Sequence, residues 1–236
     1  MVVYIVIPYR NRKEQLEEFI KLFSSFQFDY KLQIIISEQF EDYEFNRGLV
    51  KNVGFDYICK HYEVTDEDIF VLNDLDTLPA TSSSFQYNKD MSDLTIRHIC
   101  GYKNFCLGGV LSMKFETFKK CNGFPNNFWG WGGEDMCLTE RSKKIGVTIS
   151  SDDIIEIKDG RDNRKTDETK VIELKQPIYE VCDGSKNWPH VCYANRETKE
   201  MMMLNGLNNL KYEVLEEIEL LPNVKKIKTS FEKYPF

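Results

Sequence analysis

Two aspartates separated by one leucine are the first residues of this sequence whose types and spacing indicate chemistry. Asp74 and Asp76 directly follow an apolar run at residues 69–72, so we expect them at the carboxyl end of a buried β-strand. Hard divalent cations prefer oxygen ligands, and two carboxylates can hold such an ion while other positions stay open for a phosphate. An Asp-x-Asp triplet is also common in solvated turns, so it acquires meaning only from its context.

A second run, GFPNNFWGWGGED at residues 123–135, combines glycine, tryptophan and acid. Glycines beside Trp129 and Trp131 let the backbone approach a ligand closely, and an indole face can stack on the apolar face of a sugar ring. Glu134 and Asp135 are expected in the first turn of a helix, where the helix dipole favours carboxylates. The dipole explains the acids but not two tryptophans among four glycines, so the run indicates a carbohydrate site.

The elements that must position these residues alternate between strand and helix in the first half of the chain. Strands are predicted at residues 2–7, 31–37 and 69–72, and helices at 16–26 and 46–61, with a loop at 8–12. This alternation favours a mixed, mostly parallel central sheet flanked by helices, an α/β fold whose ligands collect at the carboxyl ends of the strands.

The second half of the chain has weaker patterns. Residues 81–93 resemble a surface loop, and we expect strands at 108–113 and 154–158, helices at 115–121, 134–144 and 196–204, and apolar-alternating stretches at 210–220 and 224–231. No repeat or linker divides the sequence, so we expect a single catalytic domain over residues 1–236.

Composition excludes several classes of function. Asp and Glu number 38 against 31 Lys and Arg, a net charge of −7 that argues against binding to nucleic acid or to anionic membranes. The apolar start, residues 1–8, is too short for a signal peptide or an integral membrane segment, which predicts a cytoplasmic protein. Seven cysteines without a C-x-x-C pair are expected to be reduced thiols.

Six blocks, in order along the chain, resemble the β-1,4-galactosyltransferase family, inverting enzymes of the GT-A (nucleotide-diphospho-sugar transferase) fold. The most specific is Asn122 through Asp135, NGFPNNFWGWGGED. The others are Ile7-Pro8-Tyr9-Arg10-Asn11-Arg12; Phe45-Asn46-Arg47-Gly48 with Asn52-Val53-Gly54-Phe55; Asp74-Leu75-Asp76; Gly108-Gly109-Val110; and Thr198-Lys199-Glu200 with Leu204 through Asn208. The resemblance covers nearly the whole chain and implies the same fold.

The resemblance implies a donor site for a UDP-sugar. One segment resembles the family's uridine-diphosphate loop, and a second resembles its other nucleotide contact; their guanidinium groups are planar donors suited to diphosphate and uracil oxygens. The first segment is Pro8, Tyr9, Arg10, Asn11 and Arg12, and the second is Phe45, Asn46 and Arg47. The remaining donor-side residues are Asp74, Leu75, Asp76, Cys106, Gly109, Arg161 and Trp131, which matches the tryptophan that covers the donor.

The resemblance also implies a reaction. Asp76 matches the family's metal ligand, for manganese or magnesium, and Asp135 resembles the general base that removes a proton from the acceptor hydroxyl. Galactose or N-acetylgalactosamine would pass from the UDP-sugar to a sugar hydroxyl of a saccharide or glycoconjugate, giving a β-glycosidic linkage. Glu134 resembles the carboxylate that holds the acceptor, and the other acceptor contacts are expected at Gly133, Asp135, Met136 and Trp188.

Three departures from the family pattern carry information. Met136 stands where the family has a further aspartate, which argues against its usual N-acetylglucosamine acceptor. Glu156 and Asp159 align with a methionine and a histidine among the metal ligands, which would make the site all-oxygen. Cys106 replaces a bulky tyrosine of galactose-specific members, which predicts that UDP-N-acetylgalactosamine is tolerated; simple core packing of this thiol is the alternative.

Other readings of the sequence remain open at this stage. One is an enzyme similar to polypeptide N-acetylgalactosaminyltransferases or capsule-polymerising enzymes, which share Gly-Trp-Gly-Gly-Glu-Asp blocks. Another is a sugar- or nucleotide-binding module without turnover, although the presence of Asp76, Glu134 and Asp135 together argues against it. A catalytic domain that starts on its first strand suggests a soluble bacterial or viral member of the family.

Overall fold

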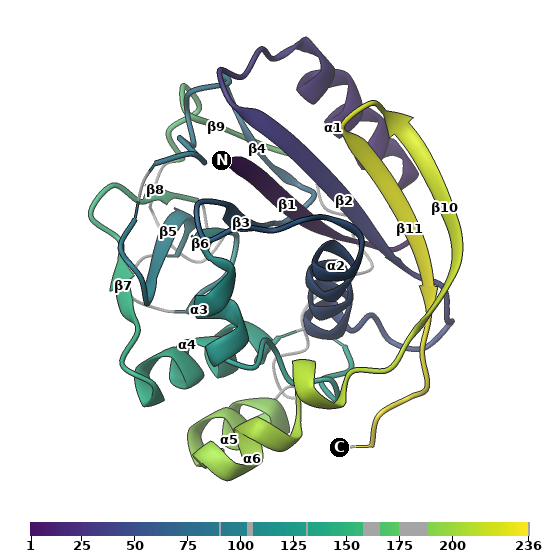
Figure 1. Cartoon of the computed structure of the whole chain (residues 1–236), viewed down its shortest axis with the longest axis vertical. Helices are drawn as coiled ribbons and strands as arrows, with labels where there is room; N and C mark the ends of the chain where they lie inside the picture. The colour runs from purple at the N-terminus through teal and green to yellow at the C-terminus, as the bar shows by residue number, and fades with distance from the viewer. Residues whose placement is uncertain (90, 103–105, 131, 158–165, 175–187, 236) are drawn as a thin grey trace.

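The structure is a computed structural model that describes all residues except 90, 103–105, 131, 158–165, 175–187 and 236. A nine-stranded sheet forms its centre, with the order β10-β11-β2-β1-β3-β6-β5-β7 and with β8 paired to β5 (Figure 1). Its strands are β1 (Val2–Tyr9), β2 (Lys31–Gln39), β3 (Ile69–Asn73), β5 (Thr95–Gly101), β6 (Val110–Lys114), β7 (Thr148–Ser150), β8 (Ile155–Glu156), β10 (Glu213–Leu221) and β11 (Val224–Ser230). A small ribbon pairs β4 (Thr77–Pro79) with β9 (Val171–Glu173).

The sheet is mixed and mostly parallel, as predicted. β1 runs parallel to both β2 and β3, and β11 runs parallel to β2. β6 is antiparallel to both of its neighbours, β3 and β5, so β5 runs in the same direction as β3, and β7 and β8 are parallel to β5. With helices against the sheet, the α/β class expected from the sequence is confirmed.

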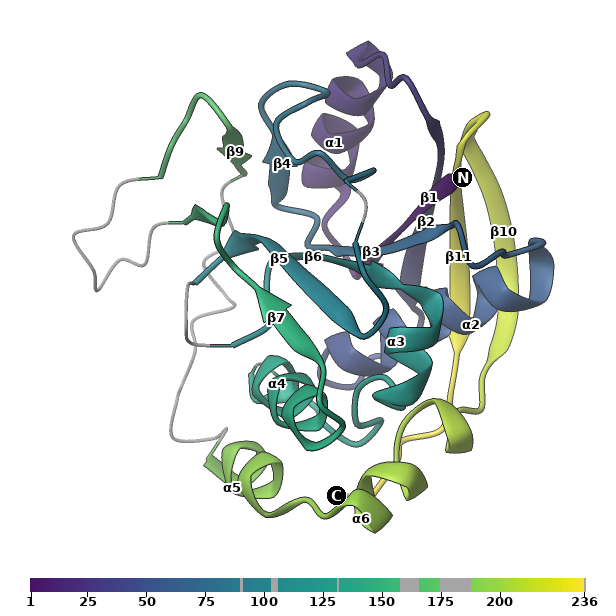
Figure 2. The same ribbon diagram turned by 60° about the vertical axis from the view of Figure 1, so that its left-hand side comes forward.

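Helices cover both faces of the sheet, and β1 shows why its sequence is continuously apolar. Val3, Ile5 and Ile7 pack in the cluster that contains the buried face of α1 (Lys13–Ser25), whereas Tyr4 and Val6 pack in the opposite cluster. That second cluster contains residues of α2 (Arg47–His61), α3 (Phe115–Lys120) and α4 (Glu134–Lys144). In Figure 2, α1 lies above the sheet and these three helices lie below it. Both faces of β1 are therefore buried beneath helices, which explains its continuous apolar sequence.

Helix α2 is buried around most of its circumference, and two glycines make this possible. A Cβ at Gly54 would lie 2.5 Å from a methyl group of Val6 on β1, and one at Gly48 would lie 2.9 Å from Cβ of Phe124. The helix is thus pressed between the sheet and the loop that contains Phe124. This close packing fixes the first turn of α2, where Arg47 begins the helix.

Some boundaries predicted from the sequence were wrong. Pro8 and Tyr9 belong to β1 rather than to a loop, because they continue its register beside Ser37 and Glu38. The strand predicted at 154–158 is shorter, as β8 contains only Ile155–Glu156. In the segment 81–93, Phe85 and Tyr87 are fully buried, so it is not simply a surface loop. Strands β4, β5, β7 and β9 were not predicted.

The helix expected at residues 196–204 is confirmed over residues 199–204, but it begins later than predicted and a separate helix ends at Arg196. α5 (Trp188–Arg196) ends before Glu197, and α6 (Lys199–Leu204) begins after Thr198. The Thr198 hydroxyl accepts a hydrogen bond from the Met201 amide and caps α6, while the Glu197 side chain turns inward to Arg141. In the part of the chain that the structure describes, no helix is both long and apolar enough to cross a bilayer.

Candidate functional site

Charged side chains from four elements meet where β1 and β3 end and where α2 and α4 begin. Arg12, just after β1, lies 3.0 Å from Asp76, which follows β3. Lys51 on α2 lies 3.1 Å from Asp74, and Arg47 Nε lies 3.1 Å from Glu134 Oε1 on α4. The structure thus brings together predicted residues of four separate sequence blocks, at the edge of the sheet where ligands bind in open α/β folds.

The first turn of α2 supplies two cations to this site. The Asn46 side chain accepts a hydrogen bond from the Leu49 amide and so caps the helix, which orients Arg47 one residue later. Lys51 follows Arg47 by four residues and therefore lies on the same face. Burial lowers the pKa of Lys51, but Asp74 and Asp135 outweigh this effect and raise it above its ordinary value, so the ammonium stays charged.

Lys51 is a site residue that the sequence reasoning missed. Its side chain is only 2% exposed and its Nζ points to a carboxylate of the Asp-x-Asp triplet. Burial of an ammonium group costs free energy of folding, which pairing with a carboxylate only partly offsets. A buried lysine at this position therefore indicates a role in the site. The signal that could have revealed it is its spacing of one helical turn from Arg47.

The two aspartates after β3 differ in their electrostatic surroundings. Burial raises the pKa of Asp74, but Lys51 and Arg47 lower it below its ordinary value overall, so Asp74 is ionised. Burial and the neighbouring charge of Asp74 raise the pKa of Asp76, although Arg12 opposes this shift. Asp76 is therefore a buried carboxylate next to another carboxylate, an arrangement that an additional cation stabilises.

At the start of α4, a tight turn presents the two acids. Gly133 adopts φ 92°, and a Cβ there would lie 2.5 Å from Cβ of His190 on α5, so a side chain has neither the conformation nor the space. His190 also stacks on Phe128 with ring centroids 4.4 Å apart, and its Nδ1 lies 3.0 Å from the Gly132 carbonyl. Glu134 is 3% exposed and paired with Arg47.

Asp135 is held against the loop before β6. The Thr139 hydroxyl donates a hydrogen bond to the Asp135 carbonyl and accepts one from the Leu107 amide, which joins α4 to that loop. A Cβ on Gly108 would lie 2.6 Å from Asp135 Oδ2, so the carboxylate rests on the glycine. Asp135 Oδ1 is buried and accepts no hydrogen bond from any residue that the structure describes. Burial and Glu134 raise the pKa of Asp135 to about 7.

The predicted nucleotide-binding segments also come together. Arg10 donates a hydrogen bond to the Tyr43 carbonyl, and its guanidinium lies 5.3 Å from the centroid of the Phe45 ring. Asn11 adopts φ 50°, a left-handed conformation that asparagine tolerates, in the turn from β1 to α1. Tyr9 is buried, and the side-chain Nδ2 of Asn46 donates to the Asn126 carbonyl, so Asn46 serves the architecture of the site.

The other predicted contacts are distributed around this centre. Leu75 is buried beneath the Asp-x-Asp turn, and the Gly109 carbonyl accepts a hydrogen bond from the Asp74 amide. The Cys106 carbonyl accepts a hydrogen bond from the amide of Gly108, the residue against which Asp135 rests. Burial, with the charges of Asp135 and Glu134, raises the pKa of the Cys106 thiol. Met136 packs with Phe128 and Tyr193, and Trp188 opens α5. Trp131, Asp159 and Arg161 lie outside the described residues.

Two predicted metal ligands fall within the described residues. Asp76 lies at the site centre, and Glu156 lies on β8 opposite Gly101 of β5. Asp76 fits a divalent cation, because it is a buried oxygen donor destabilised by a second carboxylate. Across residues 1–89, 91–102, 106–130, 132–157, 166–174 and 188–235, no group of three or more His, Cys, Asp or Glu side chains is arranged to hold a metal.

A buried network of asparagines supports the acid-bearing loop and explains several residues of the motifs. The side-chain Nδ2 of Asn52 donates to the Phe124 carbonyl and to Asn126 Oδ1, and the side-chain Nδ2 of Asn126 donates to the Gly206 carbonyl and to Asn209 Oδ1. These bonds tie α2 to the segment 122–127 and to the segment 205–209. The asparagines of the motifs therefore hold the backbone that carries the site.

A second support, missed by the sequence reasoning, is a fully buried ion pair. Arg141 on α4 and Glu197 are both 0% exposed, and Arg141 Nη2 lies 2.6 Å from Glu197 Oε1. The same guanidinium donates to the carbonyls of Gly123 and Asn205. It thus ties α4 to both segments of the asparagine network. Because the two residues are 56 positions apart in the sequence, no local sequence pattern predicts that they pair.

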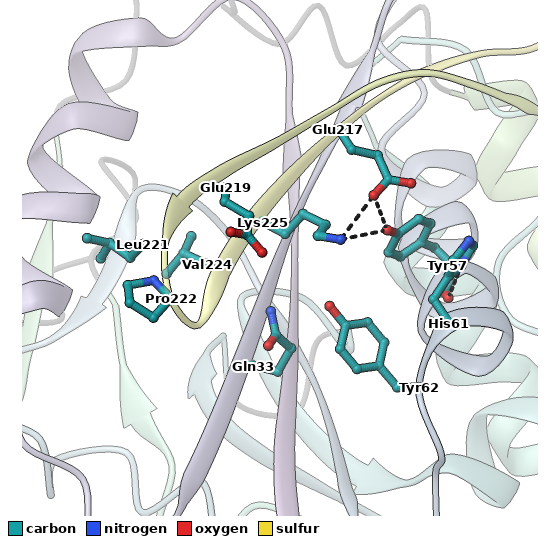
Figure 3. A pocket seen from close by; sticks show the side chains of 10 residues that line it. All are labelled: Gln33, Tyr57, His61, Tyr62, Glu217, Glu219, Leu221, Pro222, Val224 and Lys225. Carbon is teal, nitrogen blue, oxygen red and sulfur yellow. Dashed lines mark hydrogen bonds and ion pairs between the residues drawn. The ribbon is translucent and has the colours of Figure 1, made fainter.

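A cavity of about 380 Å³ lies elsewhere, between the end of α2 and the hairpin of β10 and β11. Figure 3 shows the Tyr57 hydroxyl, Glu217 and Lys225 bonded to one another along its wall, with distances of 2.8 to 3.3 Å. Tyr57 is ten residues beyond Arg47 on α2, about 15 Å along the helix axis. This cavity is therefore separate from the cluster of Asp74, Asp76 and Asp135.

Comparison of the sequence with known proteins agrees with the geometry. A family described as the N-terminal region of glycosyl transferase group 7 matches residues 1–88, and one described as the N-terminal domain of galactosyltransferase matches residues 97–161. Human β-1,4-galactosyltransferase 1 is 33% identical over 229 residues, which cover 91% of this chain and 51% of the relative. β-1,4-Galactosyltransferase 7 of Drosophila melanogaster is 28% identical over 229 residues, covering 92% and 64%. The chain spans about half the length of the first of these relatives.

Solved structures share the architecture. The catalytic domain of Drosophila β-1,4-galactosyltransferase 7 in complex with xylobiose superposes with a TM-score of 0.76 at 25% identity, covering 98% of this chain and 94% of that one. An aspartate-to-asparagine mutant of the same enzyme, in complex with manganese, UDP-Gal and xylobiose, gives a TM-score of 0.73 at 24% identity with the same coverage. These similarities confirm the GT-A fold expected from the sequence motifs.

Proposed function

Because this chain belongs to the β-1,4-galactosyltransferase family, we propose that it is a metal-dependent, inverting glycosyltransferase that moves galactose from UDP-galactose to a hydroxyl group of an acceptor sugar. The observation that carries the proposal is the start of α4, where Glu134 is buried against Arg47 and Asp135 presents a buried oxygen that has no hydrogen-bond partner among the described residues. The solved Drosophila relative was complexed with UDP-Gal, manganese and xylobiose, which supports this donor and a saccharide acceptor.

In the proposed reaction, Asp135 is the general base. It takes the proton of the acceptor hydroxyl while that oxygen attacks the anomeric carbon, and the bond from this carbon to the diphosphate oxygen breaks to release UDP. Attack opposite to the leaving group gives a β-linkage. A pKa of about 7 suits a base that works near neutral pH. Glu134 would orient the acceptor.

The donor would bind through the cations that face it. Arg10 and Phe45 are in contact, and Arg12 and Arg47 flank the Asp-x-Asp turn, so these residues would receive the nucleotide and its diphosphate. Asp76 would hold manganese or magnesium, with Glu156 and Asp159 as further candidates. When bound, the cation neutralises charge on the leaving diphosphate.

We also propose that residues 1–236 act as one catalytic domain, since β11, near the end of the sequence, pairs with β2 in the same central sheet.

Cys106 would determine how large a substituent the donor sugar can carry. It is a small side chain near Asp135 and Glu134, where the family pattern has a tyrosine. We propose that UDP-N-acetylgalactosamine is accepted beside UDP-galactose. Cys106→Tyr should remove transfer of N-acetylgalactosamine and keep that of galactose, and an unchanged ratio of the two rates contradicts the idea.

The test of the proposed function is a transfer assay with the purified protein. UDP release is followed with each UDP-sugar, manganese and an array of acceptor sugars, with EDTA as the metal-free control. The anomeric proton coupling in the product reports whether the linkage is β. Asp135→Asn should lower kcat by about 10²- to 10⁴-fold while UDP still binds, whereas Asp66→Asn, on an exposed residue, should have no effect. Near-normal transfer by the Asp135 variant would refute the assignment.

A further inference from the structure

The residues that follow β11 do not leave the molecule but lie against the candidate donor site. We call residues 231–235 the C-terminal tail. In both ribbon views the chain leaves β11 and ends near α6 (Figures 1 and 2). Nothing in the sequence motifs points to this segment. Its contacts are with residues 40–45, here called loop 40–45, and with Trp129.

The tail is bonded to loop 40–45 at two points. The Phe231 amide donates a 2.8 Å hydrogen bond to the Glu41 carboxylate, and Phe231 itself is buried. Lys233 Nζ lies 2.9 Å from Glu44 Oε2 and 5.3 Å from the centroid of the Tyr43 ring. The lysine therefore makes both an ion pair and a cation–π contact with the loop.

The tail also fixes Trp129, the first tryptophan of the glycine-rich run. The Trp129 indole N–H donates a 2.9 Å hydrogen bond to the Tyr234 carbonyl, and Lys233 lies 5.5 Å from the indole. The tail is itself anchored, because the Tyr234 hydroxyl accepts from the Lys211 amide and donates to the Asn209 carbonyl. Tyr43 of loop 40–45 completes the cluster with its ring edge-on to Trp129, 5.6 Å between centroids.

The opposite side of loop 40–45 faces the residues proposed to bind the nucleotide. The Tyr43 carbonyl accepts a hydrogen bond from Arg10, whose guanidinium lies over the Phe45 ring. The Phe45 carbonyl accepts from the Gly130 amide at 3.2 Å, next to Trp129. Loop 40–45 is thus held by the tail on one side and itself holds Arg10 and Phe45 on the other.

We propose that the C-terminal tail is a positioning element of the donor site: through Lys233 and the Tyr234 carbonyl it fixes loop 40–45 and Trp129, and so sets Arg10 and Phe45 for the nucleotide. The inference rests on the proposed function, since it assumes a nucleotide-sugar donor. Neither tail residue contacts the reacting atoms. The tail acts on the affinity for the donor and not on the chemical step.

The test compares Lys233→Met, Lys233→Arg and Trp129→Phe, the last of which removes the indole N–H and keeps an aromatic ring. UDP binding in the presence of manganese chloride is measured by calorimetry, and KM and kcat with UDP-galactose are measured separately. We expect Kd and KM to rise about 3- to 10-fold in Lys233→Met and Trp129→Phe, as for the loss of one or two polar contacts, with kcat within about 2-fold. Lys233→Arg should restore both values.

A matched control is available on β11, the strand that precedes the tail. Lys225 lies 3.0 Å from Glu217 and 5.9 Å from the centroid of the Tyr57 ring (Figure 3), so like Lys233 it makes an ion pair and a cation–π contact, but near the start of β11. Lys225→Met should leave Kd and KM unchanged. Both lysines are partly exposed, so both substitutions should shift the unfolding midpoint only slightly.

The outcomes separate the two proposals. Wild-type protein that neither binds UDP nor transfers sugar overturns the proposed function and this inference with it. Wild-type activity with an unchanged donor KM in Lys233→Met and Trp129→Phe overturns the inference alone. A loss of kcat at constant KM, or an equal effect of Lys225→Met, overturns it as well. Deletion of residues 231–236 should raise KM further, and if that chain does not fold, the point variants decide.

Discussion

The contact between Gly108 and Asp135 allows a direct test of whether Asp135 is the general base, because a methyl group added at Gly108 would displace the Asp135 carboxylate. Gly108 does not belong to the glycines with positive φ, so alanine fits its backbone. The new Cβ would lie 2.6 Å from Asp135 Oδ2, against 3.4 Å for ordinary contact, and the carboxylate must withdraw by about 0.8 Å. A misplacement of about 1 Å can cost roughly 10²-fold in rate. We therefore expect Gly108→Ala to lower kcat by about 30- to 100-fold.

The assay is steady-state UDP release at saturating donor and acceptor, together with thermal melting of each variant. Overpacking by one methyl group costs about 1–3 kcal/mol, so Gly108→Ala should remain folded at 25 °C. Gly146→Ala is the control: a Cβ there meets no atom within 4 Å, and its φ of 76° makes the substitution mildly strained without touching the site. Wild-type kcat in Gly108→Ala would refute the reasoning that Asp135 must stay where the structure places it.

The remaining predictions concern charge. Asp135 must be ionised to accept a proton, so kcat should fall as the pH drops through about 7, and a flat profile there contradicts its role. Because its pKa is raised from 3.8, the native metal-free protein holds this proton more tightly than the unfolded chain, and stability declines as the pH rises from about 4 to 7; Asp135→Asn should thus raise the Tm at pH 8 and have little effect at pH 4. Lys51→Met should move the acidic limb of the kcat profile upward by roughly one pH unit, since Lys51 lowers the pKa of Asp135; a limb that stays in place excludes this coupling. Arg141→Met should cost about 3–5 kcal/mol by leaving Glu197 buried without its cation, a fall in Tm of roughly 6–20 °C that thermal melts can measure.

The elements that carry the site could be predicted from the sequence because their signals are local. Helix α4 begins and ends at the predicted residues, Glu134 and Lys144, since a glycine turn precedes it and acids occupy its first turn. The Asp-x-Asp triplet follows a strand, as expected, because the apolar run before it is continuous. The fold class follows from the same alternation of strands and helices.

Other parts could not be predicted because distant residues create them. The three residues of β9 form a strand only because β4 lies beside them, with Pro79 opposite Val171. Nothing in the sequence around Lys51 distinguishes it from a surface lysine. It was not assigned to the site because its burial and its ion pair with Asp74 are visible only in the structure. At the break between α5 and α6, the Glu197 side chain forms an ion pair with Arg141. Local helix propensity cannot predict a contact between residues so far apart in the sequence. Whether Glu156 is a ligand stays a prediction.

The position of β11 between β10 and β2 has a consequence for how the chain is made. The strand pairs with β2, whose residues are synthesised much earlier, and the hydrogen bond from Phe231 to Glu41 spans 190 residues. Contacts of such long range are slow to form, because closing a large loop costs conformational entropy before the contact can stabilise the fold. Until β11 is synthesised, one edge of β2 is therefore unpaired, and loop 40–45 lacks its bonds to the C-terminal tail. A nascent chain without β11 would be open to aggregation at that edge.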